Sequence, residues 1–304
     1  MHSPIEPAPA PDGGPAHTAR SAFAELPSSA AHPALALEYR WLNPHWRDAP
    51  LAVFLHEGLG SVAMWKNWPQ SLCDRLGMRG LVYSRPGYGR STPRPHDMKL
   101  PVDYLATQAR DVLPALLDVL GVGAAERARM WLIGHSDGAS IALLYASAYV
   151  RALAGAVVIA PHVFVEAVSI EGIVESRMAY EQGNLRDKLA RYHADVDSAF
   201  YGWSDIWLSP AFRTWNIVEL LPAIRCPLLA VQGCDDHYGT MAQIERIADE
   251  VPHTKRVKLG NCGHSPHVET PGALDDAIES FITASRSSRR VVRSGESFVK
   301  ASKR

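Results

Sequence analysis

Cysteine is scarce in this 304-residue sequence, and its spacing argues against two common kinds of structural site. The four cysteines, Cys73, Cys226, Cys234 and Cys262, are scattered, and no two of them form a C-x-x-C pair. Neither a disulfide framework nor a thiolate zinc site is therefore expected. We expect a chain that works in a reducing cytoplasm and contains no structural metal.

The sequence also lacks long apolar runs and an excess of either charge. A membrane-spanning helix needs about 20 apolar residues, and no run approaches that length. The N-terminus has no basic segment followed by an apolar one, so a secretory signal is not expected. The 31 basic and 32 acidic side chains give a net charge of −1, which provides no field that would attract nucleic acid or an anionic membrane. We expect a small-molecule substrate as the partner, no nucleic acid and no membrane; the oligomeric state is left open.

The two ends of the chain differ in composition from the rest. Residues 1–33 are rich in proline, alanine and glycine, which predicts a flexible N-terminal extension. Residues 286–304 are basic, and they could tether nucleic acid or a membrane. Because this segment contains almost no aromatic residues and no periodicity, we favour a solvated C-terminal tail.

Between these ends, short apolar runs alternate with amphipathic stretches of helical period. Six runs read as buried strands that end in Gly, His, Asp or Ser: residues 50–60, 80–90, 129–136, 154–162, 227–236 and 253–265. Helical patterns over residues 102–122, 240–252 and 271–285 separate some of them. This alternation predicts an α/β core, residues 34–161 and 222–285, with a mostly parallel central sheet flanked by helices. Ligands of such sheets bind at the carboxyl ends of the strands.

Residues 162–221 interrupt the alternation, since they contain helical stretches and many aromatic residues but no clear strand. We interpret this interval as an inserted helical cap. Its aromatic residues could anchor the cap to the core, or they could line an apolar pocket above the strand ends. Trp203 and Trp207 are the candidates for the pocket.

One serine stands at the junction between a predicted strand and a predicted helix. In "IGHSDGAS", Ser136 lies between Gly134 and Gly138, which is the G-x-S-x-G spacing of a hydroxyl displayed on a sharp turn. A serine nucleophile needs a base, a carboxylate that orients the base, and donors for the oxyanion. The motif therefore predicts that the rest of the chain supplies these groups.

Candidates for the base and the acid follow the last two predicted strands. His264 comes after the last strand and before the last helix, in "GHSPHVETP", whereas we interpret the nearby His267 as uninformative. In "VQGCDD", Asp235 and Asp236 follow the preceding strand, and their side chains point apart, so one of them faces the histidine. The order Ser, Asp, His is the one expected when the serine lies on such a turn.

Taken together, these motifs resemble those of the α/β-hydrolase superfamily over about residues 35–284. "IGHSDGAS" is similar to its nucleophile elbow, "GHSPHVETP" to its histidine loop, and "SRPGYGRS" to a loop of its esterase-like and ring-fission branches. "GCDD" resembles its G-x-x-D acid loop, which favours Asp236 over Asp235 as the acid. The resemblance implies the α/β-hydrolase fold, a cap inserted after the sixth strand, and a reaction that needs no metal or cofactor.

The segment "LHEGLGS" departs from the family pattern, in which His-Gly starts the oxyanion loop. Glu57 occupies the first Gly position here. The resemblance implies backbone N–H donors at Gly58 and at Asp137, with Leu59 in place of Gly58 if the loop is shifted by one residue. Glu57 and Leu59 are also candidates for the substrate pocket.

Two acidic side chains near the site need an explanation. We expect Glu57 to form a buried pair with an arginine such as Arg85 or Arg90. Asp137 is explained by its place at a helix start, where the helix dipole favours a carboxylate. An alternative is that both carboxylates select cationic substrates over anionic ones.

The function predicted from the sequence is a serine hydrolase that cleaves a carboxylic ester, thioester or lactone of a small and largely apolar substrate. Ser136 attacks, His264 transfers the proton, and Asp236 holds the imidazole. A carbon–carbon bond hydrolase of a ring-fission product would use the same triad, as would a cofactor-free haloperoxidase or perhydrolase. A non-enzymatic ligand receptor on this fold is a further alternative.

Overall fold

A single eight-stranded sheet forms the centre of the part of the chain that the computed structural model describes, residues 21–150 and 153–301. Its strand order is β1-β2-β4-β3-β5-β6-β7-β8, with antiparallel pairing of β1 with β2 and of β2 with β4 and parallel pairing elsewhere. The strands are β1 (Ala22–Leu26), β2 (Leu35–Leu42), β3 (Leu51–Leu55), β4 (Arg79–Tyr83), β5 (Trp131–His135), β6 (Gly155–Ile159), β7 (Leu228–Gly233) and β8 (Lys255–Leu259).

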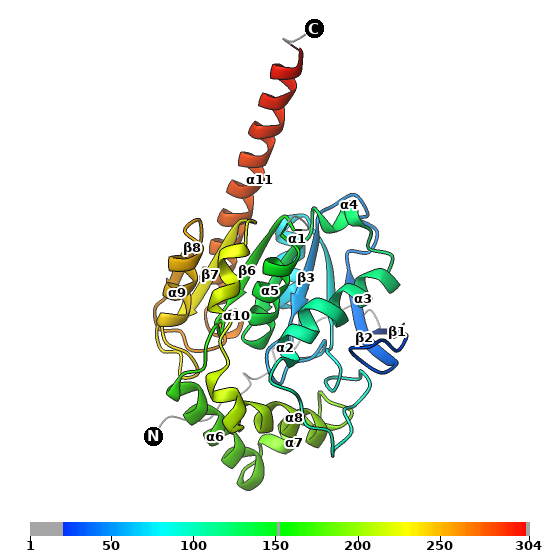
Figure 1. The fold of residues 1–304 in the computed structure, drawn as a ribbon, viewed down its shortest axis with the longest axis vertical. Coiled ribbons are helices and arrows are strands. Elements are labelled where there is room, and N and C mark those ends of the chain that lie inside the picture. The colour runs from blue at the N-terminus through cyan, green and yellow to red at the C-terminus, as the bar shows by residue number, and fades with distance from the viewer. Residues whose placement is uncertain (1–20, 151–152, 302–304) are drawn as a thin grey trace, which may run out of the picture.

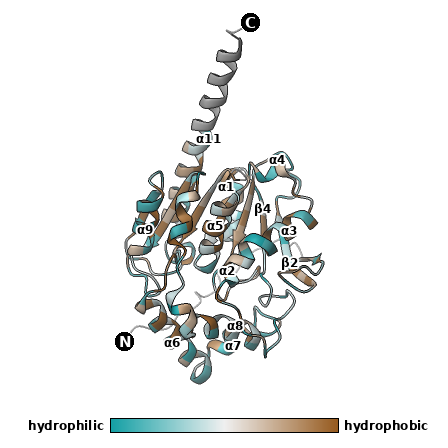
Figure 2. Cartoon of the chain, viewed as in Figure 1, coloured by the Kyte–Doolittle hydropathy of each residue, from teal (hydrophilic) through white to brown (hydrophobic). Residues whose placement is uncertain are grey.

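Helices cover both faces of this sheet (Figure 1). Successive side chains of a strand point to opposite faces, so Leu51, Val53 and Leu55 of β3 pack in one core layer and Ala52 and Phe54 in the other. The first layer includes α3, α5 and α9, and the second includes α1 and α11. Figure 2 shows the apolar strands enclosed by helices of mixed hydropathy. The helical segments of the core are α1 (Trp68–Leu76), α2 (Tyr104–Thr107), the π-helical η1 (Gln108–Val112), α3 (Leu113–Val119), α4 (Ala124–Arg127), α5 (Asp137–Ala148), α9 (Ala242–Glu250), α10 (Pro266–Glu269) and α11 (Pro271–Ala301).

The α/β fold with a mostly parallel sheet is confirmed, and each of the six predicted strand segments contains a strand. The prediction missed β1 and β2, and β1 lies inside the segment that was predicted to be a flexible extension. β1 forms because Ala24 and Leu26 are buried against the core while their neighbours are exposed, the period-two pattern of an edge strand. Residues 1–20 of the predicted extension lie outside the described residues.

The regular elements between β6 and β7, the interval for which the cap was predicted, are helical, and an isolated β-bridge joins Phe164 to Asn216. The helical elements are α6 (Ala167–Gln182), α7 (Leu185–Leu189), α8 (Val196–Leu208) and the 3₁₀ segments η2 (Pro210–Thr214) and η3 (Val218–Ala223). α8 begins where the side chain of Asp195 accepts a hydrogen bond from the N–H of Ser198, the usual arrangement at a helix start. In Figure 1, α6, α7 and α8 lie together at one end of the molecule.

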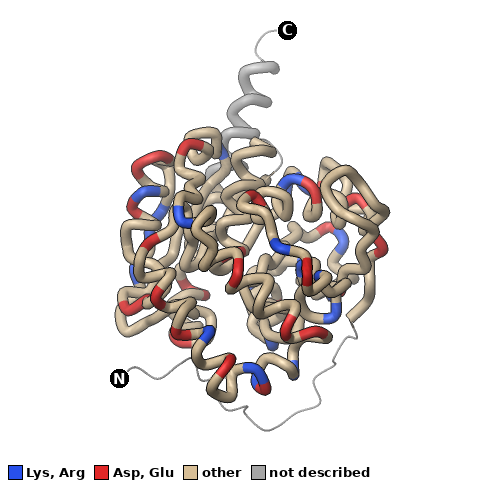
Figure 3. Tube along the Cα trace, turned by 60° about the horizontal axis from the view of Figure 1, so that its bottom comes forward, with Lys and Arg blue, Asp and Glu red and all other residues tan. Residues whose placement is uncertain are grey.

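Helix α11 leaves the body of the protein at the opposite end (Figure 1). Pro271 begins it, and no proline follows in the sequence to end it. The helix therefore includes residues 286–301, which were expected to form a tail, while residues 302–304 lie outside the described part. Within the described ranges, no helix combines the length and the apolar character required to cross a membrane. Acidic and basic residues are interspersed along the trace in Figure 3.

Candidate active site

Ser136 occupies a sharp turn between β5 and α5. Its backbone has φ 52° and ψ −118°, a conformation that is costly for a residue other than glycine. The flanking glycines are required by close packing: a Cβ on Gly134 would lie 2.3 Å from the carbonyl oxygen of Gly138, and a Cβ on Gly138 would lie 2.0 Å from that of Leu55. The turn thus holds the hydroxyl at the carboxyl end of a central strand.

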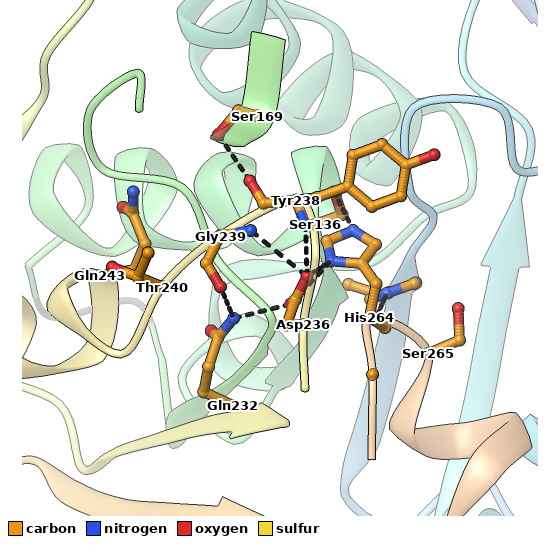
Figure 4. A network of polar contacts seen from close by, with 12 residues as sticks. Ser136, Ser169, Gln232, Asp236, Tyr238, Gly239, Thr240, Gln243, His264 and Ser265 are labelled. Carbon is orange, nitrogen blue, oxygen red and sulfur yellow. Dashed lines mark hydrogen bonds and ion pairs between the residues drawn. The ribbon is translucent and has the colours of Figure 1, made fainter. Parts of the chain in front are cut away.

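The structure brings Ser136, His264 and Asp236 together in a chain of hydrogen bonds (Figure 4). His264 Nε2 lies 3.0 Å from Ser136 Oγ, and His264 Nδ1 lies 2.8 Å from Asp236 Oδ2. Asp235 is exposed and makes no such contact. Because Nδ1 donates its proton to the carboxylate, Nε2 is left with the lone pair that can accept the hydroxyl proton.

Hydrogen bonds from the surrounding backbone and from a glutamine hold the Asp236 carboxylate in place. It accepts from the N–H groups of Tyr238 at 2.7 Å and Gly239 at 3.2 Å, and from Gln232 Nε2 at 2.7 Å. Burial alone would raise the pKa of Asp236, but His264 and the backbone N–H of Tyr238 outweigh it and lower that pKa to about 2. Burial likewise opposes the imidazolium of His264, yet Asp236 raises the pKa of His264 above its usual 6.5.

The two candidate oxyanion donors line the same cavity as Ser136. Gly58 lies in the turn that the N–H of Gly60 closes by donating to the carbonyl oxygen of Glu57 at 3.1 Å. Asp137 is the first residue of α5, so its backbone N–H has no partner inside the helix. In the structure, the backbone N–H groups of Gly58 and Asp137 are therefore both available to donate to an oxyanion.

A buried arginine connects the turn that contains Glu57 and Gly58 to the turn that contains Ser136 and Asp137. Arg85 Nη2 donates to the carbonyl oxygen of Glu57 at 2.7 Å, and its Nη1 lies 3.5 Å from Asp137 Oδ2. The Asp137 carboxylate also accepts from the hydroxyl of Tyr104 at 2.8 Å and from the indole N–H of Trp207 at 3.2 Å. Burial raises the pKa of this carboxyl even though Arg85 counteracts it. The carboxylate of Asp137 thus has its binding partners inside the protein.

The expectation that Glu57 pairs with an arginine is wrong. Its carboxylate lies instead beside the imidazole of His135, with Oε2 3.6 Å from Nδ1. Arg85 binds the main chain of Glu57 instead, because its guanidinium is directed toward Asp137. Arg90 donates its backbone N–H to the carboxylate of Glu38, and its guanidinium lies over the ring of Phe23.

The cavity beside Ser136 has a volume of about 700 Å³. Leu59, Trp203 and Trp207, all candidates from the sequence, line it, and the indole of Trp203 covers Gly58 so closely that a Cβ there would lie 2.2 Å from Trp203 Nε1. Further apolar side chains of the cavity are Met64, Ile173, Leu185, Leu189 and Val268. The side walls thus combine core and cap residues.

Sequence reasoning missed several histidines of this cavity. His135, His162 and His267 line it, and each has a buried Nδ1 without a hydrogen-bond partner among the described residues. Burial lowers the pKa of His162 and of His267 to about 3, so both are neutral at pH 7. His162 follows β6 as Ser136 follows β5, and this position after a strand was the only available signal. In the described ranges, no group of three or more His, Cys, Asp or Glu side chains is placed to hold a metal ion.

Comparison with known proteins gives relatives of modest identity. The chain is 26% identical to the putative carbamate hydrolase RutD of Pseudomonas savastanoi pv. phaseolicola over 264 residues, 78% of this chain and 95% of RutD. It is 24% identical over 235 residues to the polyketide synthase ThaQ of Burkholderia thailandensis, a match to 70% of this chain but only 11% of the synthase.

Solved structures and a family model extend the comparison. A carboxylesterase structure from the thaumarchaeon Nitrososphaera gargenis aligns with a TM-score of 0.69 at 21% identity, and the alignment covers 88% of this chain and 100% of that one. This structural similarity shows that the two chains share the same fold. The family model described as "Alpha/beta hydrolase family" matches residues 52–277, well over half of the sequence. The chain therefore belongs to the α/β-hydrolase family of enzymes.

Proposed function

We propose that this protein is a serine hydrolase that cleaves a carboxylic ester, thioester or lactone. The observation that carries the proposal is the hydrogen-bonded series from Ser136 through His264 to Asp236 at the wall of a cavity. A hydroxyl, a correctly oriented imidazole and a buried carboxylate are the groups that nucleophilic acyl transfer requires.

The proposed reaction has two steps. Ser136 Oγ attacks the scissile carbonyl carbon while His264 Nε2 takes the hydroxyl proton, and the carbonyl oxygen becomes an oxyanion near the N–H groups of Gly58 and Asp137. His264 then protonates the leaving alcohol or thiol, which leaves an acyl group on Ser136. Water, deprotonated by His264, releases the acid and restores the serine. Asp236 keeps the imidazole in the required tautomer throughout.

The cavity supports a small and largely apolar acyl or leaving group. Its side walls carry leucine, isoleucine, methionine and tryptophan side chains, and its volume of about 700 Å³ suits a compact ligand. RutD is described as a putative carbamate hydrolase, so a carbamate belongs in the substrate panel beside esters, thioesters, lactones and a ring-fission diketone.

The test measures turnover of this panel together with covalent labelling by a fluorophosphonate. We expect rapid hydrolysis of an activated short-chain ester and labelling of Ser136. Ser265→Ala is a matched control, since Ser265 also lines the cavity but contacts neither His264 nor Asp236 through its hydroxyl; it should still react, whereas Ser136→Ala should not. Turnover that persists in Ser136→Ala would overturn the proposal.

A further inference from the structure

A second buried acid–imidazole pair lies behind the catalytic histidine. His135 Nε2 lies 2.7 Å from the backbone carbonyl oxygen of His264, and His135 Nδ1 lies 3.6 Å from Glu57 Oε2. The His135 side chain is 2% exposed and that of Glu57 is 23% exposed. This pair therefore connects the oxyanion turn, the nucleophile elbow and the histidine loop.

The position of the protons follows from these partners. A carbonyl oxygen only accepts hydrogen bonds, so His135 Nε2 must carry a proton. Nδ1 has no hydrogen-bond partner among the described residues, and the carboxylate of Glu57 lies 3.6 Å from it. A bare nitrogen lone pair facing a carboxylate would be repelled, whereas a second ring proton makes the contact attractive.

We propose that His135 is a positioning residue that carries protons on both ring nitrogens and neutralises Glu57 beside the oxyanion site. This inference rests on the proposed function, because the benefit arises when an oxyanion forms next to Gly58. An unneutralised carboxylate on the adjacent residue would oppose that developing negative charge. The imidazolium offsets the carboxylate, and its other N–H holds the main chain of His264.

The charged and titratable groups around the pair are consistent with this assignment. The titratable groups that interact with Glu57 or His135 from neighbouring elements are His56, His162, His193, His264 and His267, and Arg85 binds the main-chain carbonyl of Glu57. Although burial acts in the opposite direction, the contact with His135 holds the pKa of Glu57 far below its usual range, so Glu57 is a carboxylate. His56 and His267 are neutral, since burial lowers the pKa of each.

A double-mutant cycle separates neutralisation from simple packing. His135→Gln keeps an N–H in reach of the His264 carbonyl but removes the charge, so Glu57 becomes unneutralised, and we expect kcat to fall about ten- to hundredfold. Glu57→Gln alone should lower kcat less than His135→Gln does, because it leaves no unneutralised carboxylate beside the oxyanion site. The double variant Glu57→Gln with His135→Gln should recover most of the lost kcat. Asp235→Asn with His135→Gln is the matched control, because Asp235 is a cavity carboxylate away from the pair, and it should give no recovery.

Nitrogen-15 NMR of the wild-type histidines gives a second test that depends on neither folding of the variants nor turnover. We expect protons on both Nδ1 and Nε2 of His135 at pH 7. An unprotonated Nδ1, or a double variant as slow as His135→Gln, would overturn the inference. If the wild-type protein turns over no substrate and Ser136 resists labelling, the proposed function fails instead, and the NMR result still decides the protonation of His135.

Discussion

Both carboxylate oxygens of Asp236 lie within hydrogen-bonding distance of His264 Nδ1, at 2.8 and 3.0 Å. This contact orients the ring so that Nε2 faces Ser136, and in the proposed reaction it would stabilise the imidazolium formed when Ser136 loses its proton. The side chain of Asp236 is fully buried and that of His264 is 12% exposed, so solvent weakens the interaction little. The consequences for activity can be tested residue by residue.

Ser136→Ala and His264→Ala should each lower kcat by roughly 10⁴-fold or more while the protein stays folded. Members of a triad act as a unit, because the imidazole has no function without the hydroxyl. The double variant should therefore be little worse than either single one. Steady-state kinetics with an activated ester and circular dichroism check this. Losses that simply multiply would contradict the assignment.

Asp236→Asn should lower kcat by about 10⁴-fold, because the amide cannot stabilise the imidazolium and can favour the wrong tautomer. Asp235→Asn should stay close to the wild type, since Asp235 is exposed and does not contact His264. The comparison uses the same ester and the same pH for both proteins. The reverse ranking would transfer the role to Asp235.

The pH dependence of kcat/KM should follow the pKa of His264. The imidazole must be neutral to accept the proton, so kcat/KM should rise with pH through that pKa, which lies above 6.5 because of Asp236. In Asp236→Asn the main cause of the upward shift is removed. The acidic limb of the profile should then move to lower pH while its plateau falls. An unchanged midpoint would show that another group limits the reaction.

Asp137→Asn should leave the preference for cationic over neutral esters unchanged. The carboxylate is fully buried and is satisfied by Arg85, Tyr104 and Trp207, so its charge is not offered to a substrate. The substitution keeps the backbone N–H that we assign to the oxyanion site. The ratio of kcat/KM for a cationic ester and a neutral isostere, at low and moderate salt, measures this. A fall in that ratio would assign Asp137 to substrate selection.

Two tryptophans of the cap should respond differently to substitution. Trp203→Ala should change the relative kcat/KM of acetyl, butyryl and octanoyl esters, because the indole forms a wall of the cavity over Gly58. Trp207→Phe keeps the ring but loses the N–H that binds Asp137, so it should lower Tm and leave chain-length preference intact. An identical response of both variants would contradict this division.

Sequence patterns were sufficient for the family, the fold and the six strands that follow apolar runs with clear punctuation. β1 escaped notice because Ala22–Leu26 is a short edge strand whose alternation involves only two buried side chains. The candidate triad was readable because each member follows a strand and so lies at one edge of the sheet. Neighbouring positions in sequence could not show that Asp236 rather than Asp235 turns toward His264; the family spacing suggested it.

Contacts between side chains that are far apart in the sequence were harder to predict from the sequence. Arg85 was named as a partner of Glu57, but which carboxylate its guanidinium meets depends on the packing of three strand ends against Trp207 of the cap. His135 gave no signal beyond its place next to Ser136. Its importance arises from the distances to Glu57 and to the main chain of His264, and these exist only in the folded protein.

The indole N–H of Trp207 also has a bearing on how the cap moves. If α8 lifted to admit substrate, Asp137 would lose a donor and Trp207 would leave Tyr104, whose hydroxyl lies 3.1 Å from its Nε1. That cost would recur in every catalytic cycle. We therefore expect α8 to stay in place over the cavity during turnover, and we expect the dimensions of the ligand, rather than a movement of α8, to limit entry.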